Sequence, residues 1–240
     1  MIDIQDITVR FGGVVALSGV SAQFTAPISG IIGPNGAGKT TMMNVLSGFV
    51  RATGQITAHG QTLLTLPPHR RAQWGLRRSF QKEEIADDLT VFDNVLVQVD
   101  TTPLPPREKR AEVERMLTFT GMIAHAHKMG AELNSFERRL TDIAKCMVGK
   151  PKLVMFDEPA GGLSVEETAR LGDLILGIHA ETGAQTLVID HDVDLIARIC
   201  AETLVLDFGR RIAFGPTAAV LADPKVKAAY LGTAEGHHAA

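Results

Sequence analysis

The stretch Gly33–Thr40 reads GPNGAGKT, a G-x-x-x-x-G-K-T pattern that follows an apolar strand and opens a helix. Glycines at these positions let backbone N–H groups curl around a polyphosphate, and a helix N-terminus adds partial positive charge. Lys39 is placed to reach the terminal phosphates, and the Thr40 hydroxyl is a suitable ligand for Mg²⁺. Because strand and helix both flank the loop, a chance glycine-rich turn is a poor alternative, and the pattern predicts a nucleoside-triphosphate site.

A second candidate site feature is the acidic pair Asp157 and Glu158, which directly follows the apolar run LVMF within LVMFDEP. Ligands of parallel sheets bind at the carboxyl ends of the strands, so both carboxylates are expected near the phosphate loop. Asp157 is suited to hold Mg²⁺, directly or through water, and Glu158 to polarise the water that attacks the γ-phosphate.

Three further residues are ordinary when taken alone. Gln81 lies in RRSFQ, His191 follows the strand LVID, and Phe11 lies in RFGG. A lone histidine at a strand end is more often a helix cap or a surface residue than a catalytic group. Phe11 by itself indicates a strand face or the core.

The spacing of apolar residues predicts the strands and helices that must position these groups. Residues 2–11 and 19–26 alternate apolar and polar side chains, ISGII is a short buried strand, and a helix is expected over Lys39–Ser47. From about residue 67 to 147 the chain is predicted to be mostly helical, with a proline-rich linker at 101–108. Ser164 and Glu167 form a capping box at the start of the next helix. Strands alternating with helices predict an α/β fold, a mainly parallel sheet with an added antiparallel β layer.

Bulk composition excludes several other classes. The chain has 240 residues, 45% hydrophobic and 21% charged, with a net charge of −3 and no basic arm, so nothing indicates nucleic-acid binding. No apolar run approaches the ~20 residues that span a bilayer, and no signal peptide is visible. Cys146 and Cys200 lie in apolar contexts without a CxxC partner and are expected to be small core residues of a reduced, cytosolic protein.

In order and spacing, these motifs resemble the ATP-binding subunits of ABC transporters. Within that family, RFGGVVAL, IIGPNGAGKTTMMNVLSGF, LTVFDNVLV, IDHDVDLI and the late LADPKVKAAYLG are most similar to the branched-chain amino acid (Liv-type) importers. The resemblance implies one ABC ATPase domain over 1–240, with a P-loop NTPase core at 1–80 and 150–240. A helical sub-domain is expected at about 82–148.

The resemblance also assigns roles, with ATP and Mg²⁺ as the bound species. Glu158 is implied as general base, His191 as the switch residue on the γ-phosphate, and Gln81 as the sensor of γ-phosphate and Mg²⁺. The metal would be held by Thr40, Gln81 and Asp157. Nucleotide-binding positions are Phe11 against the adenine and the loop residues Gly33, Pro34, Asn35, Gly36, Ala37, Gly38, Lys39, Thr40 and Thr41.

Function and partners follow from the same resemblance. The chain is expected to hydrolyse ATP to energise import of small amino-acid-like solutes, at the cytoplasmic face of the inner or plasma membrane. Expected partners are a second ABC ATPase subunit (a paralogue), two transmembrane permease subunits and a periplasmic or extracellular solute-binding protein. Two alternatives remain: a nucleotide-binding regulatory subunit with little hydrolysis, and a related exporter or soluble ATPase.

One stretch departs from the family. The usual signature L-S-x-G-(E/Q)-Q aligns with Leu133–Arg138, where Asn134, Phe136 and Arg138 replace Ser, Gly and Gln. Asn134 still suits a helix cap. The Phe136 benzyl group is expected to keep the backbone away from a phosphate, and Arg138 to be a solvated helix residue. Since the family lends this signature to the partner's nucleotide, pairing with a paralogue predicts an asymmetric dimer in which only the donated site is impaired. A homodimer would instead have two weak sites.

Overall fold

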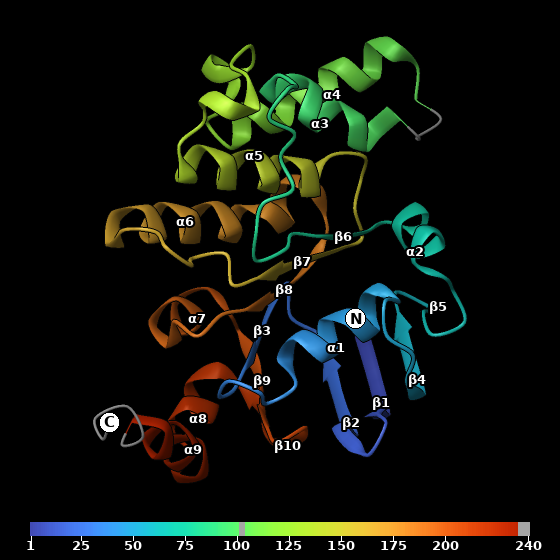
Figure 1. Ribbon diagram of the computed structural model, residues 1–240, viewed down its shortest axis with the longest axis vertical. Helices are drawn as coiled ribbons and strands as arrows, with labels where there is room; N and C mark the ends of the chain where they lie inside the picture. Colours follow the sequence, from blue (N-terminus) through green and yellow to red (C-terminus); the bar gives the residue numbers. More distant parts are fainter. Residues whose placement is uncertain (101–103, 235–240) are drawn as a thin grey trace.

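The computed structural model describes residues 1–100 and 104–234, which form two sheets and their covering helices (Figure 1). The strands are β1 Ile2–Phe11, β2 Val14–Phe24, β3 Ile28–Ile32, β4 Thr53–Ala58, β5 Gln61–Thr62, β6 Leu76–Arg78, β7 Leu153–Asp157, β8 Gln185–Ile189, β9 Glu202–Asp207 and β10 Arg210–Pro216. The helices are α1 Lys39–Ser47, α2 Pro68–Trp74, α3 Val91–Asp100, α4 Pro106–Phe119, α5 Ser135–Met147, α6 Val165–Thr182, α7 Val193–Ile199, α8 Thr217–Ala222 and α9 Pro224–Ala234, with 3₁₀ turns at Ile123–His125 and Gly130–Glu132.

The larger sheet has the strand order β10-β9-β3-β8-β7-β6. The pairs β9/β3, β3/β8, β8/β7 and β7/β6 are parallel, and only the edge pair β10/β9 is antiparallel. Every residue of β3, β7 and β8 is buried, because both faces of the sheet are covered, and this explains why these strands are mostly apolar and do not alternate with polar residues. The predicted, mainly parallel α/β core is confirmed.

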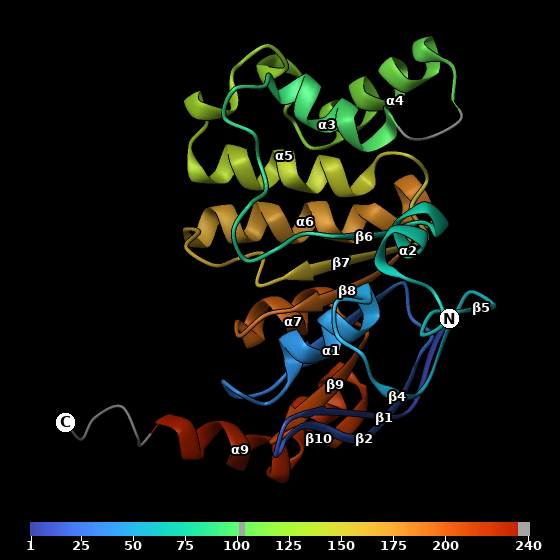
Figure 2. The same cartoon turned by 45° about the vertical axis from the view of Figure 1, so that its right-hand side comes forward.

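The smaller sheet, β2-β1-β4-β5, is antiparallel and forms the predicted added layer. Strand β1 buries alternate residues, as the sequence alternation indicated. Helix α1 lies between the two sheets (Figure 2) and fills the gap with Met42, Met43 and Leu46. The helix that begins at the phosphate loop is therefore fixed by apolar packing on two sides.

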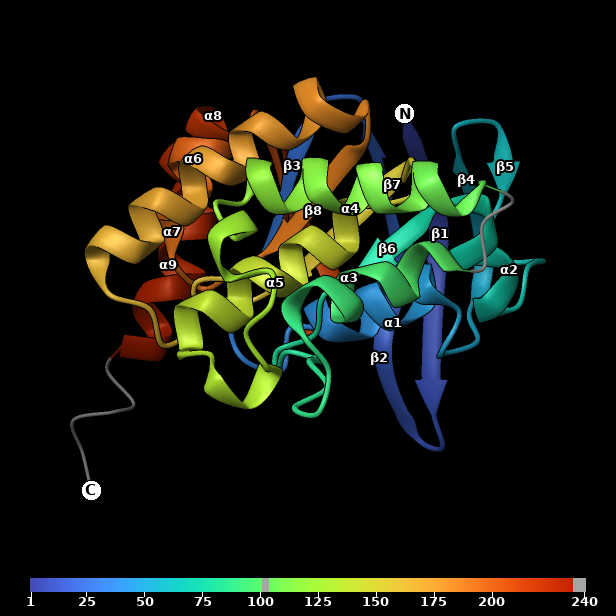
Figure 3. The same ribbon diagram turned by 90° about the horizontal axis from the view of Figure 1, so that it is seen from above.

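On the opposite face of the large sheet, α6 and α5 are stacked, and α3 and α4 lie over α5 (Figures 2 and 3). One apolar cluster joins these layers, from Val95 on α3 through Ile143 on α5 to Ile175 on α6 and Phe156 on β7. The signature helix α5 is thus continuous in packing with the strand that carries Asp157.

Several local predictions are confirmed, and one is wrong. Helix α1 spans Lys39–Ser47 as expected, and the Ser164–Glu167 capping box is formed. The mostly helical interpretation of residues 67–147 missed β6, a three-residue parallel edge strand that is too short for periodicity to reveal. Residues 101–103 of the predicted linker lie outside the described residues.

Cys146 and Cys200 are buried free thiols, as expected of small core residues. Within residues 1–100 and 104–234, none of the helices combines the length and apolar character needed to cross a membrane.

Candidate functional site: a nucleotide-binding edge

The phosphate loop connects β3 to α1, and two of its glycines are required by close packing. A Cβ at Gly33 would lie 2.2 Å from the Leu206 carbonyl oxygen, and one at Gly38 would lie 2.9 Å from that of Ala16. Gly36 is in the left-handed region, with φ of 79°, and has open space around its Cα. The loop is therefore packed closely against neighbouring backbone at Gly33 and Gly38, and it is open at Gly36, where a phosphate could approach.

Lys39 is folded onto this loop. Its Nζ donates to the carbonyl oxygens of Gly33 at 2.6 Å and Pro34 at 3.0 Å. Burial lowers the pKa of Lys39, opposed by the nearby carboxylates of Glu158, Asp157 and Asp190. The ammonium is thus held by weak carbonyl acceptors that a phosphate oxygen can replace with a stronger, charge-assisted bond.

The two acidic residues occupy different environments at the end of β7. Asp157 is buried, with Oδ2 accepting from Arg78 Nη2 at 2.7 Å, whereas Oδ1 is buried without a hydrogen-bond partner in the described structure. Glu158 follows with a left-handed backbone, φ of 51°, and its N–H donates to the Ile189 carbonyl oxygen at 2.7 Å. A non-glycine residue held in this region stores strain and fixes where its side chain leaves the strand.

A cavity of about 260 Å³ brings many of the predicted residues together. It is lined by Ala16, Asn35, Gly36, Ala37, Gly38, Lys39, Thr40, Thr41, Gln81 and Glu158. Gln81 Nε2 donates to Glu158 Oε2 at 2.7 Å, so the predicted sensor and the predicted base are in direct contact. The Thr40 hydroxyl and the Gln81 amide oxygen share this cavity. Asp157 does not line it, but its buried, unpaired Oδ1 is an oxygen of the kind that a hard divalent cation prefers, so the types of donor fit Mg²⁺.

Five predicted residues lie outside that lining: the first loop residues Gly33 and Pro34, the buried Asp157, and the more exposed Phe11 and His191. Phe11 is at the end of β1, where it pairs with Val14 of β2, and is 52% exposed. The side chain of His191 is 66% exposed, with Nδ1 3.6 Å from Asp190 Oδ1. It borders a separate cavity formed by Gly161–Leu163 and the first residues of α6 and α7. Phe11 and His191 are thus at the surface, where a nucleotide or a second chain can reach them.

Asp190, which received no role from the sequence, organises the loop after β7. Its Oδ2 accepts from the Ala160 N–H at 3.1 Å and its Oδ1 from the Asp192 N–H at 3.0 Å. Burial raises the pKa of Asp190, opposed by these hydrogen bonds. Its position directly before His191 is the only sequence signal that could have identified it.

The divergent signature stretch forms a regular helix start. Asn134 is the N-cap of α5: its Oδ1 accepts from the Glu137 N–H at 2.8 Å, and Glu137 Oε2 accepts from the Asn134 N–H at 3.1 Å. The predicted capping ability of Asn134 is confirmed as a complete capping box. The N–H groups of Ser135 and Phe136 belong to the first turn, which has no intrahelical acceptors for them, and they stay available to an anion.

Phe136 does not lie where the sequence suggested. Its side chain is only 7% exposed and packs between α5 and α6, with the Arg170 guanidinium 5.1 Å from the ring centroid. The expectation that the benzyl group stands between the backbone and a phosphate is corrected: the second position of a helix directs this side chain inward onto α6. Sequence spacing alone could not give that direction.

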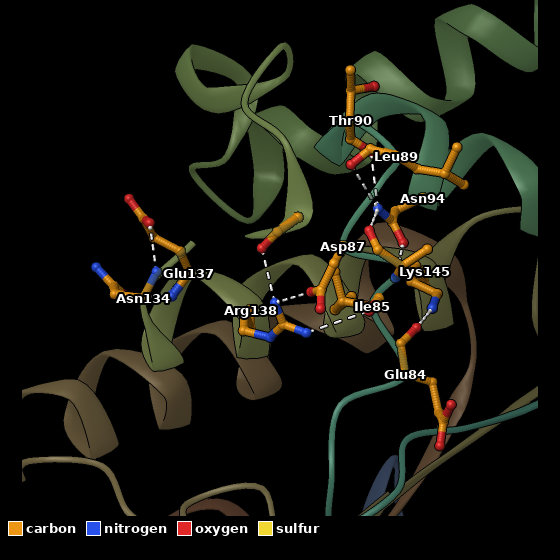
Figure 4. A network of polar contacts seen from close by, with 12 residues as sticks. Glu84, Ile85, Asp87, Leu89, Thr90, Asn94, Asn134, Glu137, Arg138 and Lys145 are labelled. Atoms are coloured by element: carbon orange, nitrogen blue, oxygen red, sulfur yellow. Dashed lines mark hydrogen bonds and ion pairs between the residues drawn. The ribbon is translucent and has the colours of Figure 1, made fainter. Parts of the chain in front are cut away.

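Arg138 is not a solvated helix residue, and that prediction is wrong. Its side chain is 23% exposed, and Nη1 donates to Asp87 Oδ1 and to the Gly130 carbonyl oxygen, each at 2.8 Å (Figure 4). Nη2 reaches the Ile85 carbonyl oxygen at 3.3 Å, and Lys145 donates to the Glu84 carbonyl oxygen. Helix α5 thereby holds the segment that follows Gln81.

That segment borders a second cavity, of about 240 Å³, between α1, α2, β6 and α5. Phe49, Phe80, Arg77 and Asp142 are among its lining residues. Asp142 is buried, and its Oδ2 has no hydrogen-bond partner in the described structure. The cavity therefore combines aromatic surface with the side chain of a buried carboxylate, whose unpaired oxygen has almost no accessible area.

Burial raises the pKa of Asp142 from 3.8 to about 6, opposed by Lys145 and Arg139 and reinforced by Glu83 and Glu84. The folded chain binds this proton more tightly than the unfolded chain, so Asp142 lowers the free energy of unfolding as the pH rises from 4 to 6. Asp142→Asn should be more stable than the native chain by about 2–3 kcal/mol at pH 8 and equal to it below pH 4. Urea unfolding at both pH values measures this, and an equal difference at both would contradict it.

Together, the loop, the acid pair and the parallel sheet edge define a P-loop ATPase core. The family model described as "ABC transporter" matches residues 17–161, and the model described as "Branched-chain amino acid ATP-binding cassette transporter" matches residues 210–236. The chain belongs to the ABC transporter family and is an ATPase of the transporter type.

Relatives of known designation cover nearly the whole chain. It is 34% identical over 251 residues to the high-affinity branched-chain amino acid transport ATP-binding protein LivG of Escherichia coli (strain K12), covering 98% of each chain. The same values hold for BraF of Pseudomonas aeruginosa, and identity is 32% over 91% of each chain for the lipopolysaccharide export system ATP-binding protein LptB of Acidithiobacillus ferridurans. The ADP conformation of MJ1267, an ATP-binding cassette of an ABC transporter, superposes with a TM-score of 0.86 at 25% identity, covering 97% of this chain and 98% of that one.

Proposed function

We propose that this chain is the ATP-hydrolysing subunit of an importer for branched-chain amino acids or similar small solutes. The observation that carries the ATPase part is the Gln81–Glu158 hydrogen bond at the wall of the phosphate cavity. Support for the import part comes from the 34% identity over 98% of the chain to LivG and BraF. The proposed division is a core at 1–80 and 150–240 and a helical sub-domain at about 82–148.

In the proposed reaction, loop amides and Lys39 bind the phosphates, and Phe11 contacts the adenine. Gln81 holds Glu158 Oε2, which leaves Oε1 to accept the proton of the attacking water. His191 would bond the γ-phosphate once the partner closes over the exposed ring. Thr40, Gln81 and Asp157 would hold Mg²⁺, whose charge offsets that which develops on the phosphate oxygens.

The proposed assembly contains a second ATPase subunit of this family, two permease subunits and a solute-binding protein, with this chain peripheral at the cytoplasmic face. The cavity lined by Phe49, Phe80 and Asp142 is the proposed docking position for the permease, beside the segment that follows Gln81. The exposed ring of Phe49, which is 57% accessible, supports a protein partner.

The proposal includes an asymmetric dimer, but Asn134 and not Phe136 is the residue that would weaken the donated site. This chain's own phosphate loop would meet the partner's signature, while the partner's nucleotide would meet α5 of this chain. Because Phe136 is buried, the proposed weakness of that donated site rests on Asn134, which lacks the serine hydroxyl and uses its Oδ1 as the helix cap.

Reconstitution tests the transport proposal. The chain would be co-expressed with a paralogous ATPase and with permease subunits of a branched-chain amino acid importer from the same organism. The complex would be placed in proteoliposomes, with the binding protein outside and ATP inside. We expect ATP-dependent accumulation of radiolabelled leucine, abolished when this chain carries Lys39→Ala. Assembly with ATP turnover but no uptake of branched-chain amino acids, urea or amides would favour the exporter alternative, for which the 32% identity to LptB is the supporting observation.

A further inference from the structure

Arg78, at the end of β6, forms a buried ion pair with the acid at the end of the neighbouring strand. Strands β6 and β7 are parallel, with Arg78 opposite Met155. Arg78 Nη2 lies 2.7 Å from Asp157 Oδ2, and each side chain is only 5% exposed. Because separating a buried pair leaves an uncompensated charge, the position of this carboxylate is tied to that of the guanidinium.

The other end of the guanidinium is anchored to the helix that follows the phosphate loop. Nη1 donates to Asn44 Oδ1 at 2.7 Å and lies 3.2 Å from Ser47 Oγ, both on α1. The guanidinium carbon lies 4.8 Å from the centroid of the Phe80 ring. A planar fork makes these contacts simultaneously, which a lysine ammonium on a flexible stem does not reproduce.

This arrangement gives the two carboxylate oxygens of Asp157 different environments. Oδ2 is occupied by Arg78, and Oδ1 is buried without a hydrogen-bond partner in the described structure. An unpaired buried carboxylate oxygen is costly, so the site favours a cationic ligand there. Three residues after Arg78, the Gln81 amide donates a more exposed hydrogen bond to Glu158. One short segment, residues 78–81, thus positions both acidic residues.

We propose that Arg78 is a positioning residue for the ATPase reaction: it fixes Asp157 to α1 through Oδ2, so that Oδ1 is held ready for the divalent cation beside Thr40. The inference rests on the proposed role of Asp157 at the metal. It predicts that loss of the fork weakens the metal's contribution to nucleotide binding and leaves binding of the phosphates themselves intact.

The test measures the dissociation constant of a fluorescent, non-hydrolysable ATP analogue with Mg²⁺ and with EDTA, on the full chain. The dissociation constant in EDTA divided by the constant with Mg²⁺ reports how much the metal contributes to nucleotide binding. Arg78→Gln is expected to reduce that ratio about tenfold, as loss of a group that orients a metal ligand typically does, with the EDTA value unchanged within about twofold. Arg78→Lys, which keeps the charge but not the fork, should retain an intermediate ratio.

Arg77→Gln is the matched control, because it removes the same charge from the adjacent residue, whose Nη1 donates only to the backbone oxygens of Ala72 and Leu76. Its ratio should equal that of the native chain, and thermal unfolding of each variant reports folding. Asn44→Ala, which removes one anchor of the fork, provides a milder variant expected to lower the ratio less than Arg78→Gln does.

Three results would overturn the inference. The first is an unchanged ratio in Arg78→Gln, and the second is a ratio in Arg78→Lys equal to that of the native chain. The third is a higher dissociation constant in EDTA for Arg78→Gln without a lower ratio, because Arg78 would then only compensate charge. Asp157→Asn separates the two levels of the argument. If it also leaves the ratio unchanged, the proposed metal role of Asp157 fails; if it lowers the ratio while Arg78→Gln does not, only the inference about Arg78 fails.

Discussion

Glu158→Gln in this chain alone should lower the ATP turnover of the assembled transporter by about 10²–10⁴-fold, because a positioned general base contributes that much to such reactions. Glutamine keeps an oxygen that can still accept from Gln81 Nε2, so the local structure and the affinity for ATP should be retained. Turnover would be measured by phosphate release from the reconstituted complex, with the partner subunit unchanged.

Glu108→Gln is the matched control, since Glu108 is an exposed residue of α4, far in sequence from the phosphate loop and the acid pair, and loses the same charge. It should leave turnover unchanged. If Glu158→Gln also left turnover unchanged, the partner's site would be the one that hydrolyses ATP. The proposed asymmetry would then be reversed, and the regulatory alternative for this chain would be favoured.

The second large effect is expected in stability, at the residue that replaces the signature glycine. Phe136→Gly should lower the free energy of unfolding by about 3–5 kcal/mol, because it removes a buried aromatic side chain and leaves a cavity between α5 and α6. Loss of the contact with Arg170 adds to that cost. Denaturant unfolding measures the change at equilibrium.

Ser135→Gly introduces the same backbone freedom one residue earlier, at an exposed position, and should cost at most about 1 kcal/mol. The comparison isolates the side chain of Phe136 from the flexibility of glycine. A stable Phe136→Gly variant with raised ATP turnover would contradict the buried geometry and restore the view that the phenyl ring obstructs the partner's nucleotide.

Local sequence patterns were sufficient for the parts of the site that lie close together along the chain. The G-x-x-x-x-G-K-T loop between a strand and a helix was confirmed with the bounds of α1, because glycine, lysine and helix start are all local requirements. The Ser164 cap was confirmed for the same reason. Strand β6 was missed because three residues with two arginines carry no periodic signal.

The sequence did not predict the side-chain partners, because these contacts join residues that are far apart in the chain. Arg138 was predicted to be solvated, yet it binds Asp87 and the Gly130 and Ile85 carbonyl oxygens. Nothing in the local sequence RRSFQ assigns a role to Arg78, and only the pairing of β6 with β7 places it against Asp157. The Arg138–Asp87 contact joins residues that are 51 positions apart, and the Arg78–Asp157 contact joins residues that are 79 positions apart. Local sequence spacing gives no information about contacts at such separations.

The sequence by itself determined that this chain carries a P-loop ATPase site, because a phosphate loop and an acid pair at strand ends are defined by residue type and short spacing. The ABC family came from the resemblance of the whole set of motifs to ABC transporter subunits. Only the tertiary structure decided what the divergent signature means. Whether Phe136 faces a phosphate or the protein interior depends on which side of α5 packs against α6, and that is settled by burial of the apolar face. The tertiary structure likewise decided that Arg78, and not a residue adjacent in sequence, holds the carboxylate of Asp157.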